Sequence, residues 1–266
     1  MKTHRICLLS GCVAACLAQS ASSQVIFSDN FESGNLNNWT ASGASPLAID
    51  NTQNTVPGGG SFSAYANLSL NRMHHNIIAD NGGVELSGWS TFTAWIYDST
   101  MTRPYVQALS YSGTGLPNGG TTADGSLSQL LAVGKYSSVT MAGEVYDATK
   151  YQARVLAGAS SGWFNLNDPG APSRSTGWHK FTIERLADDT TLNFYVDDIL
   201  SRTITGATAG SWDTITMGFG TTSTSNGDAW YDGFALSIVP EPSAATFGLL
   251  GLLALALRSV SRRRKI

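Results

Sequence analysis

The chain has 266 residues, and its formal charge of −3 at pH 7 conceals an uneven distribution of charge. Two basic residues lie in the first 24 residues and five in the last 28, which leaves nine basic and 18 acidic residues between 25 and 238. A segment with a formal charge of about −9 disfavours nucleic acid and anionic lipid as partners, whereas a bound cation or a neutral glycan remains compatible with it.

The N-terminus has the three parts of a secretory signal peptide. Lys2 and Arg5 form a basic start, residues 6–17 are mostly apolar, and small residues follow at 18–23. We therefore expect residues 1–24 to form a signal helix that directs export and is removed by signal peptidase between residues 20 and 24. The segments that end at Cys12 and Cys16 also resemble a bacterial lipobox, so lipidation at either cysteine is an alternative. No cysteine follows Cys16, so the processed chain is expected to lack disulfides.

Short runs of alternating aromatic and β-branched residues, separated by Gly, Ser, Thr and Asn, fill residues 25–238. No helical period is sustained before residue 244, which predicts an all-β domain. Strands are expected at 25–27, 92–97, 105–110, 130–133, 151–156, 179–185, 191–196, 214–219 and 229–238. Nine such strands favour a two-sheet antiparallel sandwich. A tight hairpin turn is expected at Asp197 and Asp198, because Asp198 can tolerate a positive φ.

Three motifs in this segment carry a family resemblance. The sequences GWHKFTI at 177–183, NFYVDD at 193–198 and WYDGF at 230–234 resemble the concanavalin A-like, laminin G-like jelly roll. The opening FSDNFESG at 27–34, closing with Trp39, is similar to the start of bacterial carbohydrate-binding modules of that fold. The resemblance implies a jelly-roll domain over 25–238 and suggests carbohydrate as a ligand, although a fold alone does not fix a function.

A cation site is expected where the first and last strands of this domain meet. A period of two places Trp230, Asp232 and Phe234 on one face of the last strand, which puts a carboxylate among core residues. A lone buried Asp is costly, and a hard cation with oxygen ligands would offset that cost. Carbohydrate-binding modules of similar sequence often hold such an ion. We therefore expect structural calcium with the ligands Asp29, Glu32, Asp228 and Asp232. The alternative is that a bulge turns Asp232 outward or that loop amides hydrogen-bond it.

The sequence offers little sign of catalytic machinery. A retaining glycosidase needs two carboxylates about 5 Å apart, which this fold usually supplies as Glu-x-Asp-x-x-Glu on one strand face. That pattern is absent, and the nearest pair, Glu144 and Asp147, is expected on opposite faces of a strand. The motif H-E-x-x-H is also absent. A serine hydrolase is not expected, and His179 is expected to be a packed structural residue. We expect a non-catalytic protein; a polysaccharide-active hydrolase or lyase on the same fold is the alternative.

Sugar binding would depend on exposed aromatic rings, because such rings stack on pyranose faces. Trp163 and Tyr111, in Ser- and Gly-rich surroundings, are the expected sugar-binding residues. The remaining candidates are expected to pack in the core or to close strand ends, and these are Trp39, Trp89, Trp178, Trp212 and Trp230.

The C-terminal segment, residues 239–266, combines a proline-rich motif, an apolar helix and a basic end. The motif is Val239, Pro240, Glu241 and Pro242, and the basic end includes Arg262, Arg263 and Arg264. The apolar stretch over 243–260 would extend roughly 27 Å as a helix, close to the thickness of a bilayer core. We expect a transmembrane helix at 244–260. The basic cluster places its flank in the cytoplasm and hence the domain outside.

This order of parts resembles the PEP-CTERM sorting signal of Gram-negative bacteria that make exopolysaccharide. The resemblance implies that the helix anchors the chain transiently in the inner membrane and that an exosortase processes it near the motif. An ordinary tail anchor is the alternative. We therefore expect an exported protein of the cell surface or extracellular polysaccharide matrix, with extracellular polysaccharide as its expected partner.

Overall fold

The computed structural model describes residues 23–42, 45–53, 59–67, 71–99, 103–111, 127–135, 141–158, 160–218 and 228–239. The predicted signal peptide with Cys12 and Cys16, the transmembrane helix and the sorting motif after Val239 lie outside these ranges. Every regular element within them is a strand. A search of the same ranges for a helix long and apolar enough to cross a membrane finds none.

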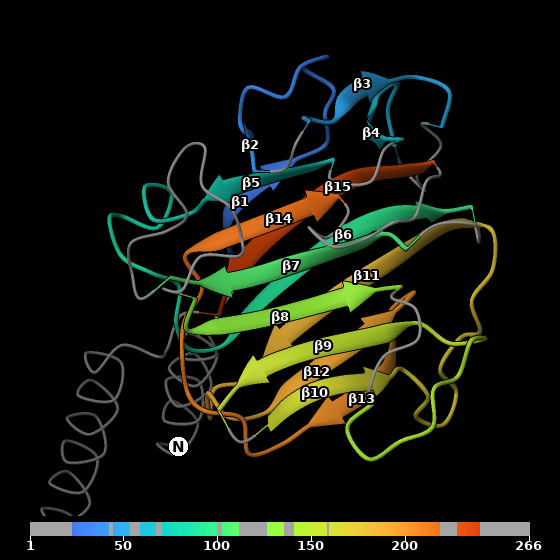
Figure 1. Ribbon diagram of the computed structural model, residues 1–266. Helices are drawn as coiled ribbons and strands as arrows, with labels where there is room; N and C mark the ends of the chain where they lie inside the picture. Colours follow the sequence, from blue (N-terminus) through green and yellow to red (C-terminus); the bar gives the residue numbers. More distant parts are fainter. Residues whose placement is uncertain are drawn as a thin grey trace, which may run out of the picture. The chain divides into compact units, whose positions relative to one another are not determined.

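The strands form two antiparallel sheets that pack as a sandwich within a compact unit, Val25–Ile238 (Figure 1). The eight-stranded sheet has the order β13-β12-β11-β6-β15-β4-β3, and β1 also pairs with β15. The seven-stranded sheet has the order β10-β9-β8-β7-β14-β5-β2. In both sheets strands far apart in sequence are neighbours, as in a jelly roll.

The strands of the eight-stranded sheet are β1 (Gln24–Asp29), β3 (Ala48–Asp50), β4 (Ser63–Ala66), β6 (Ser90–Asp98), β11 (Gly177–Arg185), β12 (Leu192–Val196), β13 (Ile199–Ile204) and β15 (Ala229–Ile238). The strands of the seven-stranded sheet are β2 (Thr40–Ala41), β5 (Arg72–Asn76), β7 (Tyr105–Ser110), β8 (Gln129–Gly134), β9 (Gln152–Ala157), β10 (Ser160–Asn165) and β14 (Thr214–Gly218).

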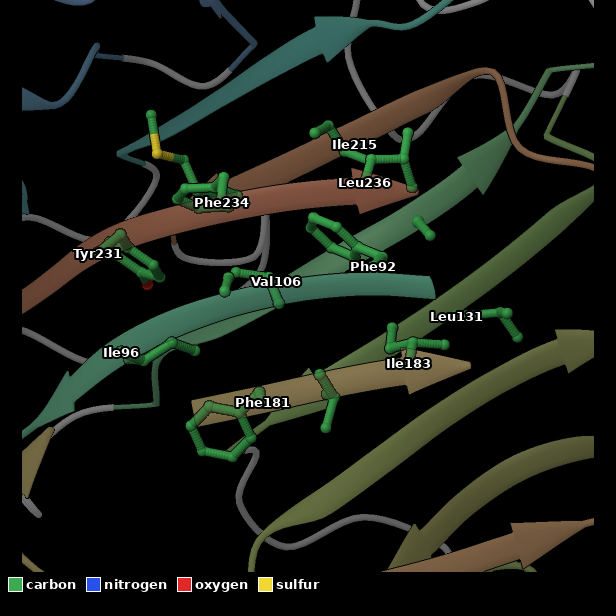
Figure 2. Close-up of a cluster of buried hydrophobic side chains, with 14 of the residues drawn as sticks. Phe92, Ile96, Val106, Leu131, Phe181, Ile183, Ile215, Tyr231, Phe234 and Leu236 are labelled. Carbon is green, nitrogen blue, oxygen red and sulfur yellow. The ribbon is translucent and has the colours of Figure 1, made fainter. Parts of the chain in front are cut away.

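The core lies between the two sheets and follows the period of two. Phe92, Ala94 and Ile96 of β6 are at most 1% exposed, while the residues between them are half-buried. Figure 2 shows side chains of both sheets in this cluster, including Phe181 from β11 and Val106 from β7. Each large apolar side chain buried in this way contributes about 1.5–3 kcal/mol. Alternation therefore leaves the intervening side chains on the outer face of each sheet.

A β-bulge interrupts this alternation in β15. Asp232 pairs with Trp95 of β6, but the next paired residue on β15 is Ala235. Gly233 has φ +55°, and a Cβ atom at this position would lie 2.8 Å from Cδ1 of Trp95, so glycine suits both the backbone and the space. Because of the inserted residue, odd-numbered side chains face the core before the bulge and even-numbered side chains face it after the bulge. The expectation that Trp230 and Phe234 share a face is therefore wrong: Phe234 is 2% exposed in the core, whereas Trp230 lies on the outer face.

The turn between β12 and β13 is the predicted hairpin. Asp197 has φ +52° and Asp198 has φ +63°, the pattern of a type I′ turn. The Asp197 carboxylate accepts hydrogen bonds from the backbone N–H of Lys180 at 2.9 Å and from Nδ1 of His179 at 2.8 Å. His179 is 8% exposed, which confirms its expected place as a packed histidine.

Candidate functional site

Four aromatic side chains from four neighbouring strands form a row on the outer face of the eight-stranded sheet. Tyr65 of β4 pairs with Trp230 of β15, Trp230 with Tyr97 of β6, and Tyr97 with Trp178 of β11. The successive ring centroids are 5.0, 5.4 and 5.7 Å apart. Because neighbouring strands lie about 4.8 Å apart, this aromatic row extends over about 14 Å across the sheet.

The rings of the aromatic row contact one another in two ways. Tyr65 and Trp230 are stacked, with 28° between their planes, whereas the Trp230–Tyr97 and Tyr97–Trp178 pairs are edge-to-face at 87° and 77°. Each such pair contributes about 0.5–1.5 kcal/mol beyond simple burial, so the row stabilises the sheet. All four side chains are half-buried, and each therefore keeps part of its surface accessible.

Carboxylates hold two of these rings in place. Nε1 of Trp230 donates to Asp50 at 2.6 Å, and the Tyr65 hydroxyl donates to Asp228. Burial, followed by the hydrogen bond and charge of Asp228, raises the pKa of Tyr65 to about 12. Burial acts to raise the pKa of Asp50, but hydrogen bonds from Thr52 and Trp230 outweigh it and the pKa is lowered. Asp50 is therefore ionised at neutral pH.

An open depression lies further along the same face, lined by Thr91, Thr182, Glu184, Tyr195 and Asp198. Glu184 accepts hydrogen bonds from the Tyr195 hydroxyl at 2.7 Å and from Nε1 of Trp89 at 3.0 Å. Burial acts to raise the pKa of Glu184, but these hydrogen bonds and one from Asn193 lower it overall. The donors to Asp50 and Glu184 are thus neutral groups, whereas Asp198 forms an ion pair with Lys180 at 2.7 Å.

The structure separates the two sugar-binding residues expected from the sequence. Tyr111 is 1% exposed and packs with Leu109, so its expected exposure is wrong; it directly follows β7 and lies in a small apolar cluster. Trp163 is half-buried on β10, the edge strand of the seven-stranded sheet. The guanidinium of Arg154 on β9 lies 5.2 Å from its ring centroid. Trp163 therefore remains a candidate, on a different sheet from the aromatic row.

The other tryptophans divide between the core and the surface. Trp39 and Trp212 are 5% and 0% exposed, which confirms their expected core positions. Trp89 is 41% exposed and directly precedes β6, and Trp178 and Trp230 lie on the outer face at the second residues of β11 and β15. None of these three is in the core, and their positions match the other expectation, a place at a strand end. The outer position of Trp178 could have been predicted from the sequence. Residues separated by an odd number of positions in a strand point to opposite faces, and Trp178 has this relation to the core residues Phe181 and Ile183.

Three of the four predicted calcium ligands form a carboxylate cluster: Asp29, Glu32 and Asp232. Asp232 is 2% exposed and accepts a hydrogen bond from the backbone N–H of Gly233 at 2.6 Å. Burial, together with the charges of Glu32 and Asp29, raises its pKa to about 7. The fourth predicted ligand, Asp228, instead accepts a hydrogen bond from Tyr65 in the aromatic row.

Protein N–H groups already occupy much of this carboxylate cluster. Asp29 accepts hydrogen bonds from the Phe31 backbone at 2.9 Å and the Trp39 indole at 3.0 Å, with a third from Asn38. Glu32 accepts from the backbone N–H groups of Ser61 and Phe62 at 2.8–2.9 Å. In the part of the chain that the structure describes, no group of three or more His, Cys, Asp or Glu side chains is arranged to hold a metal ion. The described residues thus fit calcium only in part, and its binding stays a prediction.

Glu144 and Asp147 lie in the segment between β8 and β9, so the expectation that a strand carries them is wrong. Glu144 accepts hydrogen bonds from the backbone and side-chain N–H groups of Asn165, both at 3.1 Å, and forms an ion pair with Arg202. Asp147 accepts from the backbone and hydroxyl of Thr149 at 2.8 and 2.6 Å. Both carboxylates therefore organise local structure in this segment.

No protein-family model matches the sequence, and no curated protein matches it. Among solved structures, the chain is similar to the binding domain of Paraclostridial Mosquitocidal Protein 1, with 11% identity and a TM-score of 0.51 over 85% of this chain and 51% of that one. It thus spans about half of that domain.

Two further solved structures have TM-scores of 0.44. One is domain 4 of AbnA, a GH43 extracellular arabinanase from Geobacillus stearothermophilus, solved with arabinotriose; it has 9% identity, over 82% of this chain and 93% of that one. The other is the apo Crh5 transglycosylase, with 12% identity over 84% and 85%. At these identities the likeness concerns the fold, and the chain is an all-β protein with the two-sheet architecture of a jelly-roll sandwich.

Proposed function

We propose that this chain is a non-catalytic carbohydrate-binding protein and that the aromatic row is the surface on which the glycan stacks. One observation carries the proposal: four aromatic residues occupy paired positions on neighbouring strands of an outer sheet face, where packing of the core does not require aromatic rings. They are Tyr65, Trp230, Tyr97 and Trp178. Aromatic surfaces beside a few polar groups are typical of sugar sites. The depression around Glu184 supplies hydroxyl and carboxylate groups on the same face.

The electrostatics of this face favour a neutral glycan over a uronic acid polymer. Asp50 and Glu184 both have lowered pKa values, and their hydrogen-bond donors carry no charge. The surrounding segment, residues 25–238, is itself acidic. A polyanionic chain would be repelled at this face, whereas the hydroxyl groups of a neutral glycan could donate to these carboxylates.

Glycan binding by the full-length chain tests the proposal. An array of neutral and acidic polysaccharides identifies the ligand, and titration calorimetry then compares the wild type with Trp178→Ala and Trp230→Ala. We expect each variant to weaken binding about tenfold, as loss of about 1.4 kcal/mol of stacking energy implies. Trp163→Ala is the control, since it removes a half-buried tryptophan from the other sheet.

Three other outcomes would change the proposed binding site or the proposed function. Binding that survives both row variants and fails in Trp163→Ala would move the site to β10. The absence of binding to any glycan would favour a purely structural matrix protein. Product release from laminarin or alginate that stops in Glu144→Gln would instead support the polysaccharide-active alternative.

We also propose that the chain is exported and sorted by its C-terminal segment. The support is in the sequence: a signal peptide at 1–24 and, at the other end, the order of Pro240-Glu241-Pro242, apolar stretch and arginine cluster. Replacing Pro240 and Glu241 by alanine should leave the full-length chain in the inner membrane of a host that has an exosortase. Unchanged processing of this variant, measured by mass on an immunoblot, would mean that the segment is a simple anchor.

A further inference from the structure

A buried cation with no ion-pair partner among the described residues lies at the end of the sandwich where β6 begins and β11 ends. Arg185 is 1% exposed and pairs with Ser90 of β6. Its Nη2 donates to Oε1 of Gln129 at 2.7 Å, and its guanidinium lies 5.3 Å from the ring centroid of Trp212. Nε and Nη1 of Arg185 are buried and have no acceptor among the described residues.

A second buried donor belongs to the same group of side chains. Trp212 is 0% exposed, and its Nε1 likewise has no acceptor in the described part of the chain. The indole N–H can only donate, as can every nitrogen of the guanidinium. Arg185 and Trp212 therefore offer donors that the surrounding side chains leave unmatched.

The acceptor that the described residues supply to this group, Gln129, is held in a fixed orientation. Its Nε2 donates to the carbonyl oxygens of Thr208 at 3.0 Å and Ala209 at 3.3 Å, which directs Oε1 toward Arg185. Gly210 packs so closely that a Cβ atom there would lie 2.0 Å from Nε2 of Gln129. The loop thus fixes one hydrogen bond to the guanidinium and leaves the other donors available.

No described carboxylate forms an ion pair with Arg185, so its charge is compensated only by the Trp212 ring and, from a distance, by Asp189. Burial lowers its pKa to about 10, so the guanidinium stays protonated at neutral pH. Asp189 is the acid whose charge acts on it, but the two form no ion pair within 4.0 Å, and the Asp189 carboxylate accepts a hydrogen bond from Gly88 instead. A buried charge without a partner is strongly unfavourable, and unmatched buried donors add to that cost.

We propose that this end of the core binds a small inorganic anion, of which chloride is the representative, between the free donors of Arg185 and Nε1 of Trp212. An ordered water would satisfy donors but would leave the charge uncompensated, whereas an anion does both. The near-complete burial of both side chains selects a monatomic ion over a carboxylate or phosphate ligand. The inference is independent of glycan binding, because it concerns the interior of the sandwich.

Thermal unfolding of the full-length chain in matched sodium salts tests this site. At constant ionic strength, replacing gluconate with chloride or bromide should raise the Tm of the wild type by about 4 °C at a halide concentration ten times Kd. Arg185→Met, which removes the charge and keeps most of the volume, should abolish the difference between the salts. Arg154→Met is the matched control, since Arg154 also lies over a tryptophan ring but is half-buried, and it should keep the halide effect.

Two further measurements keep the test decisive if Arg185→Met does not fold. Trp212→Phe keeps an aromatic ring, although a smaller one, and lacks the indole N–H, so it should weaken the halide effect. Crystals grown with bromide should show an anomalous peak within hydrogen-bond distance of Arg185. A wild-type Tm that is equal in gluconate, chloride and bromide, or a crystal structure in bromide with only water at these donors, would overturn the proposal.

Discussion

Replacing Asp232 with asparagine should stabilise the folded protein at neutral pH. The side chain is 2% exposed, and burial with the nearby charges of Glu32 and Asp29 raises its pKa from 3.8 to about 7. The folded state therefore holds a proton that the unfolded chain releases near pH 4. The difference of about three between the two pKa values corresponds to about 4 kcal/mol, at 1.36 kcal/mol for each.

The sign of the effect follows from the same linkage. The contribution of Asp232 to stability is greatest below about pH 4, falls as the pH rises toward 7, and stays low above the folded pKa. Asparagine is neutral throughout, and its Oδ1 can keep the hydrogen bond from Gly233. Asp232→Asn should therefore gain up to about 4 kcal/mol relative to the wild type between pH 4 and pH 8.

Urea unfolding of the full-length chain at pH 4, 6 and 8, followed by tryptophan fluorescence, measures this difference. Asp198→Asn is the control, because Asp198 is exposed in a turn whose positive φ suits asparagine. Its ion pair with Lys180 is at the surface and contributes little, so the stability of this variant should stay close to that of the wild type at each pH. A difference between Asp232→Asn and wild type that does not change with pH would refute the reasoning.

The same variant tests the predicted calcium ion. If calcium binds at the cluster, it competes with the proton on Asp232, so the wild-type Tm should rise on addition of calcium, more at pH 8 than at pH 6, and a chelator should reverse the rise. Asp232→Asn should lose most of this response. If calcium does not change the Tm of the wild type at pH 8, the predicted calcium site is wrong.

Two further predictions concern the fold. Burial acts to lower the pKa of His179, but the hydrogen bond and charge of Asp197 raise it overall, so the stability due to this pair is complete below about pH 6.5 and is lost as the pH rises through the folded pKa. His179→Gln should thus be destabilising in urea at pH 5.5 and less so at pH 9; an equal loss at both would contradict this. Gly233→Ala should lower the free energy of unfolding by about 1–3 kcal/mol, because the position has a positive φ and a Cβ atom would contact Trp95. Gly88→Ala should lower it less, because Gly88 has a positive φ but open space where the Cβ atom would lie. Equal losses in the two variants would contradict the role of the contact.

Alternation and turn chemistry predicted the fold class and nine strands, all of which the structure contains. The ends match at 105–110 and 229–238 and differ by one or two residues in the others. The strands β2, β3, β4, β5 and β10 were not predicted, and β13 was expected only as the second arm of the hairpin. In β4, β5 and β10 the sequences SAYA, RMHHN and SSGWFN lack runs of β-branched residues in a period of two. In β5 the first three residues, Arg72, Met73 and His74, are all buried, so no alternation marks that strand. Pairing with neighbouring strands, on both sides for β4 and β5 and on one side for β10, determines these strands more than local propensity does.

The aromatic row could not be predicted from spacing alone. It depends on the register of β4, β6, β11 and β15, which are far apart in the chain, and no local pattern fixes that register. The position of Trp230 also depends on the bulge, for which a glycine inside a strand was the available signal. The carboxylate cluster was easier to predict from the sequence, because Asp29 and Glu32 are close in the chain and the burial of Asp232 was expected.

The single inserted residue in β15 lets one central strand serve two surfaces with different requirements. Before Gly233 the odd-numbered Tyr231 enters the core and Trp230 joins the aromatic row; after it the even-numbered Phe234 and Leu236 enter the core. Deleting Gly233 would restore a strict parity that sends either Tyr231 or the Phe234–Leu236 pair into solvent. The number of residues in β15 around Gly233 is therefore more important for the fold than the identity of most of its side chains. Deletions here should be tolerated less well than most substitutions on the same strand.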